Sequence, residues 1–252
     1  MTTEKQTNNS RAVVTIGMND APWLDEQTVS EIILSTPHQL RDAVKNGTPS
    51  LGAGAIYPIP LDEVVLKPAD AEKLKPFPAH WRYLYGMDVG WNRTAVLFAA
   101  QDPETDIIYI TDEYYQGKME PEIHAARIQQ KGSWMIGVID PASHARSQVD
   151  GQQLIRIYRT LGLRLREANN EREAGIYKVW SRLSLGKLKF FPNTFNLQNE
   201  YLLYRRDEDG KIVKEHDHAM DALRYLINTW HFATPRPVKT TTGRTLDRRY
   251  NV

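Results

Sequence analysis

Three short apolar runs follow one another closely in the middle of the chain, and they constrain the fold more than any other feature. The runs cover Tyr83–Val89, Thr94–Ala100 and Ile107–Tyr115, and the polar turn Asp102–Asp106 separates the last two. Apolar runs of this length with turn residues between them predict β-strands, and such short connections join antiparallel neighbours. We therefore expect an antiparallel meander of three strands.

Helix-like and strand-like segments alternate after this meander. Helical spacing of apolar residues recurs in five segments, at Pro121–Lys131, Gln152–Leu161, Glu171–Leu185, Leu197–Tyr204 and Asp217–Phe232. Short apolar runs predict three more strands, at Trp134–Ile139, Leu163–Arg166 and Leu188–Phe191. A three-strand meander followed by this alternation is the element order of the ribonuclease H-like fold. The predicted fold class is therefore α/β, with a ribonuclease H-like mixed sheet in which the antiparallel meander joins parallel strands and helices cover both faces.

The segment before the meander has a different character. Residues 47–78 are rich in proline and glycine, which break helices and central strands. Upstream of them, Val13–Ile16 is strand-like, and helical patterns cover Asp25–Leu34 and His38–Lys45. We predict four parts of the chain: a disordered N-terminus at residues 1–12, a linker with at most short elements at 13–78, a globular domain at 79–234 and a mobile basic tail at 235–252.

Composition excludes several kinds of site. The chain has no cysteine, so disulfides, thiolate metal sites and a cysteine nucleophile are excluded, and a metal ion would need carboxylate or imidazole ligands. No apolar run approaches the roughly 18 residues of a membrane span, and Met1–Arg11 lacks the apolar core of a signal peptide. We expect a protein with no membrane partner and no export signal.

Charge is unevenly distributed, although the formal net charge is only +1. Residues 81–155 carry 6 basic and 10 acidic side chains, whereas residues 156–206 carry 11 basic and 4 acidic ones. An acidic block followed by a basic block suits a cation site beside a groove for a polyanion. Ordinary solvated faces produce the same pattern, so charge alone leaves both interpretations open.

Two aspartates end predicted strands. Asp88 closes the first strand within the motif Gly86–Gly90, and Asp140 ends the buried run Met135–Ile139 just before Pro141. Each could be an ordinary turn aspartate. If the two strands are parallel neighbours, however, both carboxylates emerge at the same edge of the sheet. Carboxylates brought together repel each other, so this arrangement indicates a bound cation or a raised pKa.

A third group of candidates lies in the last predicted helix. Asp217 and Asp221 are four residues apart and share one helical face. Asp217 could simply complement the helix dipole or cap the helix N-terminus. Asp221 lies deeper in the predicted helix, where capping does not explain it, and its structural alternative is an ion pair with Arg224. His216 and His218 lack a third ligand at a suitable spacing, so we expect them to be surface residues or supporting residues beside the site.

Several stretches together resemble one family. They are GMDVGWNRTAVLFAA, VIDPAS, VTIGMNDAPWL…TPSLGAGAIYP and the long segment that ends in GKLKFFPNTFNLQNEYLLY…DHAMDALRYL. They look like the C-terminal part of the tailed-bacteriophage terminase large subunit, over roughly Val13–Trp230. The DHAMDALRY motif and the G-K-L-x-F-F…E-Y-x-x-Y pattern are specific, whereas G-x-D-x-G is not.

The resemblance implies a function and a set of ligands. The family joins an N-terminal packaging ATPase to a ribonuclease H-like nuclease that cuts concatemeric viral DNA. Asp88, Asp140 and Asp221 match its three metal-binding acids, and further acids in some relatives keep Asp217 as a candidate. These carboxylates would bind Mg²⁺ or Mn²⁺, with two ions expected. The implied partners are double-stranded DNA, the ATPase domain, the small terminase subunit and the portal, in the cytoplasm of an infected bacterial host.

The sequence departs from the family in one respect. A P-loop requires G-x-x-x-x-G-K followed by Ser or Thr, but each Gly-Lys pair here is followed by Met119, Leu188 or Ile212. We therefore expect no ATP site in this chain. It is expected to be a nuclease-bearing fragment of a longer terminase, with 13–78 as the lid-like segment after the ATPase core, or a separate chain that lacks the motor.

Basic residues of the second block would contact DNA phosphates without reading sequence. The candidates are Arg156, Arg159, Arg164, Arg166, Arg172, Lys178, Arg182, Lys187 and Lys189. We expect these residues to lie beside the acids, and we expect Trp180, Phe190 and Phe191 to be core residues rather than platforms for bases. Two alternatives remain: another ribonuclease H-like nuclease, such as a junction resolvase or a ribonuclease H, and a non-catalytic module that docks onto the portal.

Overall fold

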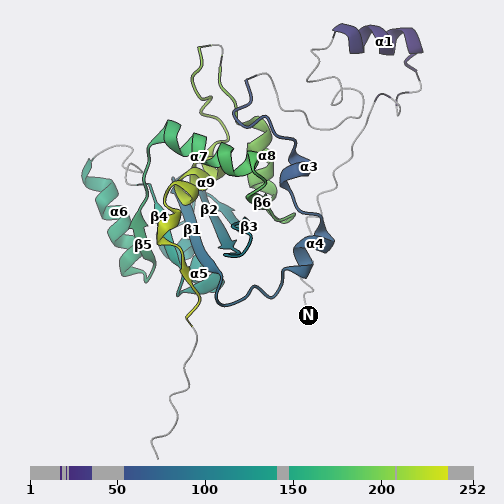
Figure 1. Ribbon diagram of the computed structural model, residues 1–252. Helices are drawn as coiled ribbons and strands as arrows, with labels where there is room; N and C mark the ends of the chain where they lie inside the picture. Colours follow the sequence, from purple (N-terminus) through teal and green to yellow (C-terminus); the bar gives the residue numbers. More distant parts are fainter. Residues whose placement is uncertain are drawn as a thin grey trace, which may run out of the picture.

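A mixed seven-stranded sheet forms the centre of the computed structural model (Figure 1). The structure describes residues 18, 21, 23–35, 54–140, 148–207 and 209–237. At 33–35 and 148–153 it describes the backbone only. The sheet has the order β5-β4-β1-β2-β3-β6, and β7 pairs with the beginning of β1. The strands are β1 (Arg82–Val89), β2 (Thr94–Gln101), β3 (Ile108–Gln116), β4 (Ile136–Ile139), β5 (Arg164–Glu167), β6 (Leu188–Phe190) and β7 (Thr234–Pro235).

Strand directions agree with the predicted mixed sheet. β1, β2 and β3 form the antiparallel meander, while β4 pairs parallel with β1, β5 with β4, and β6 with β3. The meander forms because the connections at 90–93 and 102–107 are too short for anything but antiparallel neighbours. The parallel strands each follow a helix that carries the chain back across the sheet.

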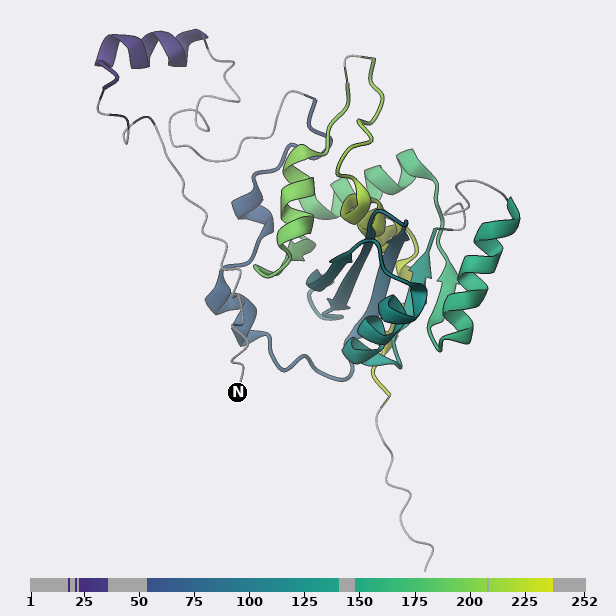
Figure 2. The ribbon, with the colours of Figure 1, turned by 180° about the vertical axis from the view of Figure 1, so that it is seen from behind.

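Helices cover both faces of the sheet, as predicted. One face carries α7 (Arg172–Ser184), α8 (Phe195–Leu203) and α9 (His218–Asn228). The opposite face, seen from behind in Figure 2, carries α5 (Pro121–Gly132) and α6 (Gln148–Thr160). The short helix η3 (Trp230–Phe232) follows α9. Alternate residues of β1 serve the two cores, because Leu84 packs under α9 whereas Tyr83, Tyr85 and Met87 pack on the other side.

The helix α9 lies unusually close to the central strand at Gly86. A Cβ atom placed on Gly86 would come within 2.4 Å of the backbone oxygen of Ala222 and 2.7 Å of the Leu226 Cβ. Any side chain at this position would therefore push α9 away from β1. Because Gly86 and Asp88 share one face of β1, this close packing also sets the distance between α9 and the end of the strand.

Residues 54–74 pack against the sheet instead of standing apart from it. This part of the predicted linker contains only the short helices α3 (Leu61–Val64) and α4 (Pro68–Lys73), as expected. However, Tyr57 and Val64 are buried in the core under α8 and α9, and Val65 forms a bridge to Phe190. The domain boundary at residue 79 stays a prediction, but the core draws on residues upstream of it.

The two ends of the chain are described only in part. Helix α1 (Glu26–Ser35) lies at the helical pattern predicted for Asp25–Leu34. Residues 1–12, 238–252 and the predicted Val13–Ile16 and His38–Lys45 elements lie outside the described residues. At the start of the predicted tail, β7 pairs with β1 and the Arg236 N–H donates to the Ala79 carbonyl. The mobility of the tail stays a prediction. None of the helices in the described parts is long and apolar enough to span a membrane.

Candidate functional site

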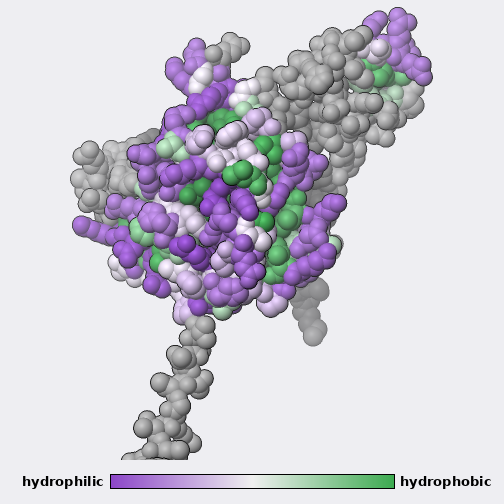
Figure 3. Space-filling view, in the orientation of Figure 1, coloured by the Kyte–Doolittle hydropathy of each residue, from purple (hydrophilic) through white to green (hydrophobic). Residues whose placement is uncertain are grey.

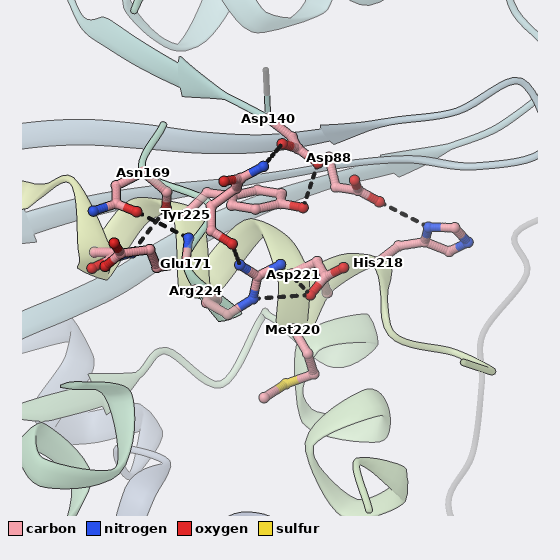
Figure 4. Close-up of polar contacts among 12 residues, drawn as sticks. Asp88, Asp140, Asn169, Glu171, His218, Met220, Asp221, Arg224 and Tyr225 are labelled. Atoms are coloured by element: carbon pink, nitrogen blue, oxygen red, sulfur yellow. Dashed lines mark hydrogen bonds and ion pairs between the residues drawn. The ribbon is translucent and has the colours of Figure 1, made fainter. Parts of the chain in front are cut away.

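Asp88 and Asp140 lie side by side at one edge of the sheet. Asp88 is the second-last residue of β1, and the parallel register of β1 and β4 pairs Met87 with Ile139. Continuing that register by one residue places Asp140 beside Asp88, and Figure 4 shows the two carboxylates next to each other. The two carboxylates were expected to meet if their strands were parallel neighbours, and β1 and β4 are parallel neighbours.

Asp221 approaches the same edge from α9. It lies in the first turn of that helix, which begins at His218, and is therefore four residues beyond the N-cap residue Asp217. Burial raises the pKa of Asp88, and the nearby carboxylates of Asp221 and Asp140 raise it further, while the hydrogen bond to His218 acts in the opposite direction. Three acids from β1, β4 and α9 therefore share one electrostatic environment.

Each of these carboxylates has a protein partner. The Asp88 Oδ2 lies 2.9 Å from His218 Nδ1. Asp140 accepts a hydrogen bond at Oδ2 from the Tyr225 hydroxyl (2.8 Å) and at Oδ1 from the Asn170 side-chain amide (3.4 Å). The Asp221 Oδ1 accepts from Nε and Nη2 of Arg224, at 3.2 and 2.8 Å. The structural alternative for Asp221, an ion pair with Arg224, is therefore formed.

The acids fit a hard divalent cation in their chemistry but are not assembled around one point. Carboxylate oxygens are the ligands that Mg²⁺ and Mn²⁺ prefer. Burial, and to a smaller extent the neighbouring Asp221 and Asp140 carboxylates, raise the pKa of Asp88, and a cation at this edge would offset the repulsion among the acids. Within the described part of the chain, no three His, Asp or Glu side chains are grouped closely enough to hold an ion. The metal roles of Asp88, Asp140, Asp221 and Asp217 therefore stay predictions.

Asp217 occupies the N-cap position of α9 without capping it. Its side chain makes no capping hydrogen bond, so the capping explanation for this residue is wrong. Burial raises the pKa of Asp217, and the Asp221 carboxylate raises it further, which places Asp217 near the acidic group. Capping comes instead from Glu200 of α8, whose Oε2 accepts from the N–H groups of Ala219 (2.5 Å) and Met220 (3.2 Å).

Sequence reasoning missed Glu200, Tyr225 and Asn170 as parts of this environment. The sequence pattern around Glu200 could have identified it, because this acid lies among the apolar residues Leu197 and Tyr201 on one face of a helix. In the structure Glu200 is only 3% exposed. Asn170 lies in a polar loop, where no such pattern identifies it. Of the two histidines, His218 contacts Asp88 and His216 is exposed, as expected for a supporting and a surface residue.

The predicted DNA-contacting residues do not form one track. Arg164 and Arg166 lie on β5, at one end of the strand order, and Lys187 and Lys189 lie at β6, at the other end, roughly 24 Å away at the usual strand spacing. These basic residues are therefore spread over both ends of the strand order, and their place beside the acids stays a prediction. β5 and β6 are consecutive strands, but α7 carries the chain across the sheet between them.

Many of these basic side chains already bind their own chain. Arg159 donates to the Leu165 carbonyl, Arg164 to that of Trp134, and Lys189 to that of Glu63. Lys178, Arg182 and Lys187 line a pocket of about 500 Å³ at the far end of α9, where they contact Asn228, Asp106 and the Thr105 carbonyl. Arg156, Arg166 and Arg172 are exposed. DNA contact by any of these residues stays a prediction.

Of the three aromatic residues predicted to lie in the core, two are buried and one is exposed. Phe190 and Phe191 are buried, as predicted, but Trp180 is 39% exposed and its ring stacks on the exposed Tyr177, at 5.9 Å between centroids. Figure 3, in the orientation of Figure 1, shows the face that carries α7, where hydrophilic residues dominate and hydrophobic ones form separate patches. The prediction that Trp180 belongs to the core is wrong, because its position on α7 faces solvent.

Comparisons with known proteins agree on one family. Residues 85–229 match the model of the terminase RNaseH-like domain. The chain is 27% identical over 230 residues to the terminase large subunits of Enterobacteria phage LP7 and Salmonella phage P22. These matches cover 88% of this chain but 47% and 45% of the relatives, so the chain spans about half the length of the curated relatives it matches.

Two solved structures share the fold. The nuclease domain of the P22 large terminase superposes with a TM-score of 0.66 at 24% identity, over 74% of this chain and 97% of that one. The large terminase of a thermophilic bacteriophage, solved in complex with ADP, gives a TM-score of 0.59 at 21% identity, over 86% of this chain and 55% of that one. Together with the family match, these likenesses confirm the predicted ribonuclease H-like fold class.

Proposed function

The chain belongs to the terminase RNaseH-like domain family, and from this premise we propose that it is a divalent-metal-dependent endonuclease that cleaves double-stranded DNA. The observation that carries the proposal is that Asp88 and Asp140 lie side by side at one edge of the sheet and that Asp221 acts electrostatically on Asp88 from α9. Convergence of acids from distant parts of the chain costs electrostatic energy, so it favours a site that binds a cation.

Asp88, Asp140 and Asp221 would hold Mg²⁺ or Mn²⁺, with Asp217 as a further candidate ligand. Two such ions would supply an activated water and stabilise the leaving oxygen of a phosphodiester. The protein's own contribution is to hold the carboxylates on rigid elements. Asp88 sits on the central strand and is 18% exposed, so its position is set by β1 and by the contact with His218.

The proposed substrate is concatemeric viral DNA during genome packaging. The curated relatives named terminase large subunits support this proposal. The ATPase domain, the small terminase subunit and the portal are the proposed partners, in the cytoplasm of the infected host. Contacts to phosphates would give cleavage little sequence specificity and a strong dependence on salt. A cleavage rate that stays constant between low and physiological salt would contradict this part of the proposal.

The decisive experiment compares plasmid cleavage by aspartate-to-asparagine variants of the full chain in the presence of Mn²⁺. We expect Asp88→Asn and Asp221→Asn to abolish cleavage while leaving the circular dichroism spectrum unchanged. Asp70→Asn is the matched control, because it removes one carboxylate from the exposed ion pair with Lys73 on α4. Cleavage by Asp88→Asn or Asp221→Asn at the rate of the control would overturn the assignment.

Substrate and metal comparisons separate the alternatives. A junction resolvase or a ribonuclease H would use the same acids, so linear duplex, four-way junction and RNA–DNA hybrid should be compared at equal concentration. We expect duplex DNA to be cleaved best. A portal-docking module without catalysis would show no effect of Mg²⁺ or Mn²⁺ on its melting temperature, whereas a cation bound among the acids would raise it.

A further inference from the structure

We propose that Arg224 and Tyr225 are positioning residues, which hold the Asp221 and Asp140 carboxylates in place for a divalent cation. This inference rests on the proposed function and adds two residues to the site. They are neighbours on α9, yet they contact acids that belong to different elements (Figure 4). A single turn of one helix thus controls the orientation of two carboxylates.

Arg224 is held rigidly. Its side chain is 2% exposed, and its guanidinium lies over the Tyr225 ring, 4.4 Å from the centroid. Its Cγ packs against Gly175 of α7, where an added Cβ would come within 2.6 Å of it, so this close contact requires a glycine. Nε and Nη2 both donate to the Asp221 Oδ1. Because both donors bind the same oxygen, Arg224 anchors Oδ1 of the Asp221 carboxylate and does not use Oδ2 in this contact.

The third donor of Arg224 binds the loop that follows β5. Nη1 donates to the Asn170 carbonyl at 3.2 Å, and the neighbouring Asn169 is bound by Asn228 and Thr229 at the end of α9. Because the loop is held at these points, the Asn170 side-chain amide reaches the Asp140 Oδ1 at 3.4 Å. Arg224 thereby contributes to the orientation of Asp140 as well as that of Asp221.

Tyr225 contacts Asp140 directly. Its hydroxyl donates to Oδ2 at 2.8 Å, which together with Asn170 engages both oxygens of the carboxylate. The hydroxyl carries no charge, so it does not neutralise the acid and its effect is mainly on orientation. Hydrogen bonds from outside a metal site to its ligands commonly change metal affinity by about 10–100-fold. If the ion pair between Arg224 and Asp221 served stability alone, it would not explain why the neighbouring Tyr225 hydroxyl binds a second acid, Asp140.

The test is a titration of the full chain with Mn²⁺, followed by electron paramagnetic resonance, which reports the free ion directly. We expect Tyr225→Phe to weaken Mn²⁺ binding by about tenfold. Tyr201→Phe is the matched control, because it removes a buried hydroxyl that donates to the Ile59 carbonyl at 3.0 Å, away from the acids. The control is expected to bind Mn²⁺ like the wild type, even if both variants melt at lower temperature.

Arg224→Lys tests the two-donor grip separately from the charge. Lysine keeps the positive charge but is a point donor without the planar fork, so we expect weaker Mn²⁺ binding here too. Wild-type affinity in both Tyr225→Phe and Arg224→Lys would overturn the positioning role while leaving the proposed function intact. Absence of Mn²⁺ binding by the wild type would instead overturn the proposed function, and the positioning role with it.

Discussion

The carboxylate of Glu200 accepts a hydrogen bond from the backbone N–H of Ala219 at 2.5 Å, so a buried acid of α8 caps the helix that carries Asp221. The same carboxylate accepts from Met220 and from the Tyr115 hydroxyl. Burial raises the pKa of Glu200, and these hydrogen bonds oppose the rise. The position of the α9 N-terminus therefore depends on a residue in another helix.

Replacing Glu200 should destabilise the domain in proportion to the acceptors lost. Glu200→Ala leaves two helix N–H groups and the Tyr115 hydroxyl without their acceptor, so we expect a loss of about 3 kcal/mol in the free energy of unfolding. Glu200→Gln retains an acceptor of the same shape and should lose about 1 kcal/mol. Urea denaturation measures both values. Equal stability of the two variants would show that the carboxamide cannot replace the carboxylate.

Adding a methyl group at Gly86 should separate α9 from β1. Gly86→Ala places a Cβ 2.4 Å from the Ala222 backbone oxygen, and such overpacking costs about 1–3 kcal/mol. We also expect a loss of DNA cleavage, because Asp221 moves with α9. The control is Gly90→Ala, whose nearest neighbour would be the Arg93 oxygen at 3.1 Å, so its effect should be smaller. Thermal melting and a plasmid cleavage assay measure both effects, and a Gly86→Ala variant as stable and active as Gly90→Ala would contradict the packing argument.

Removing the hydroxyl of Tyr85 should stabilise the protein. Among the described buried side chains, Tyr85 Oη has no hydrogen-bond partner, and the residue is 1% exposed. Because a buried polar group without a partner costs free energy, we expect Tyr85→Phe to gain about 1 kcal/mol. On the same strand, Tyr83 donates its hydroxyl to the Pro78 carbonyl at 2.7 Å. Tyr83→Phe should therefore be destabilised in the same melting experiment, and a loss of stability in Tyr85→Phe would refute the prediction.

Stability should fall in mild acid in part because of His124. This histidine is 3% exposed and its Nδ1 lies 2.8 Å from the Tyr114 hydroxyl. Burial lowers the pKa of His124 from 6.5, so below pH 6.5 the unfolded chain binds a proton more readily than the folded one. The stability associated with neutral His124 is present above pH 6.5 and is lost as the pH falls through the lowered pKa.

The matched variant for this effect is His124→Gln, which removes the titrating group. Urea unfolding at a series of pH values from 7.5 to 5 should show that the wild type loses more stability than His124→Gln over this range. A constant difference between the two proteins across the series would mean that the folded-state pKa of His124 is not lowered.

The local elements were predictable from short segments of sequence. The meander followed from three apolar runs with turns between them, and the five helices of the domain from their apolar spacing, because both patterns act over a few residues. The capping of helix ends was less predictable: the N–H groups of Ala219 and Met220 in α9 donate to Glu200, a residue that is distant in sequence. The packing of Tyr57 and Val64 into the core was hidden by the prolines around them.

The acids and the bases of the candidate site differ in how well sequence anticipated their placement. Asp88 and Asp140 could be selected because acids at the ends of apolar strands meet whenever those strands are parallel neighbours. The basic residues were expected together because they are close in sequence, but β5 and β6 lie at opposite ends of the sheet. Nearness along the chain does not imply nearness in space once a helix crosses the sheet.

Residue order alone was thus enough for the fold class and for naming the acids, since periodicity and strand ends are local properties. The partners of those acids depended on the packed molecule. His218 meets Asp88, Tyr225 meets Asp140 and Arg224 grips Asp221 only because Gly86 lets α9 lie against β1 and because β4 pairs with β1 in one particular register. These contacts join groups far apart in the chain, and the distances between such groups are set by packing rather than by any local pattern.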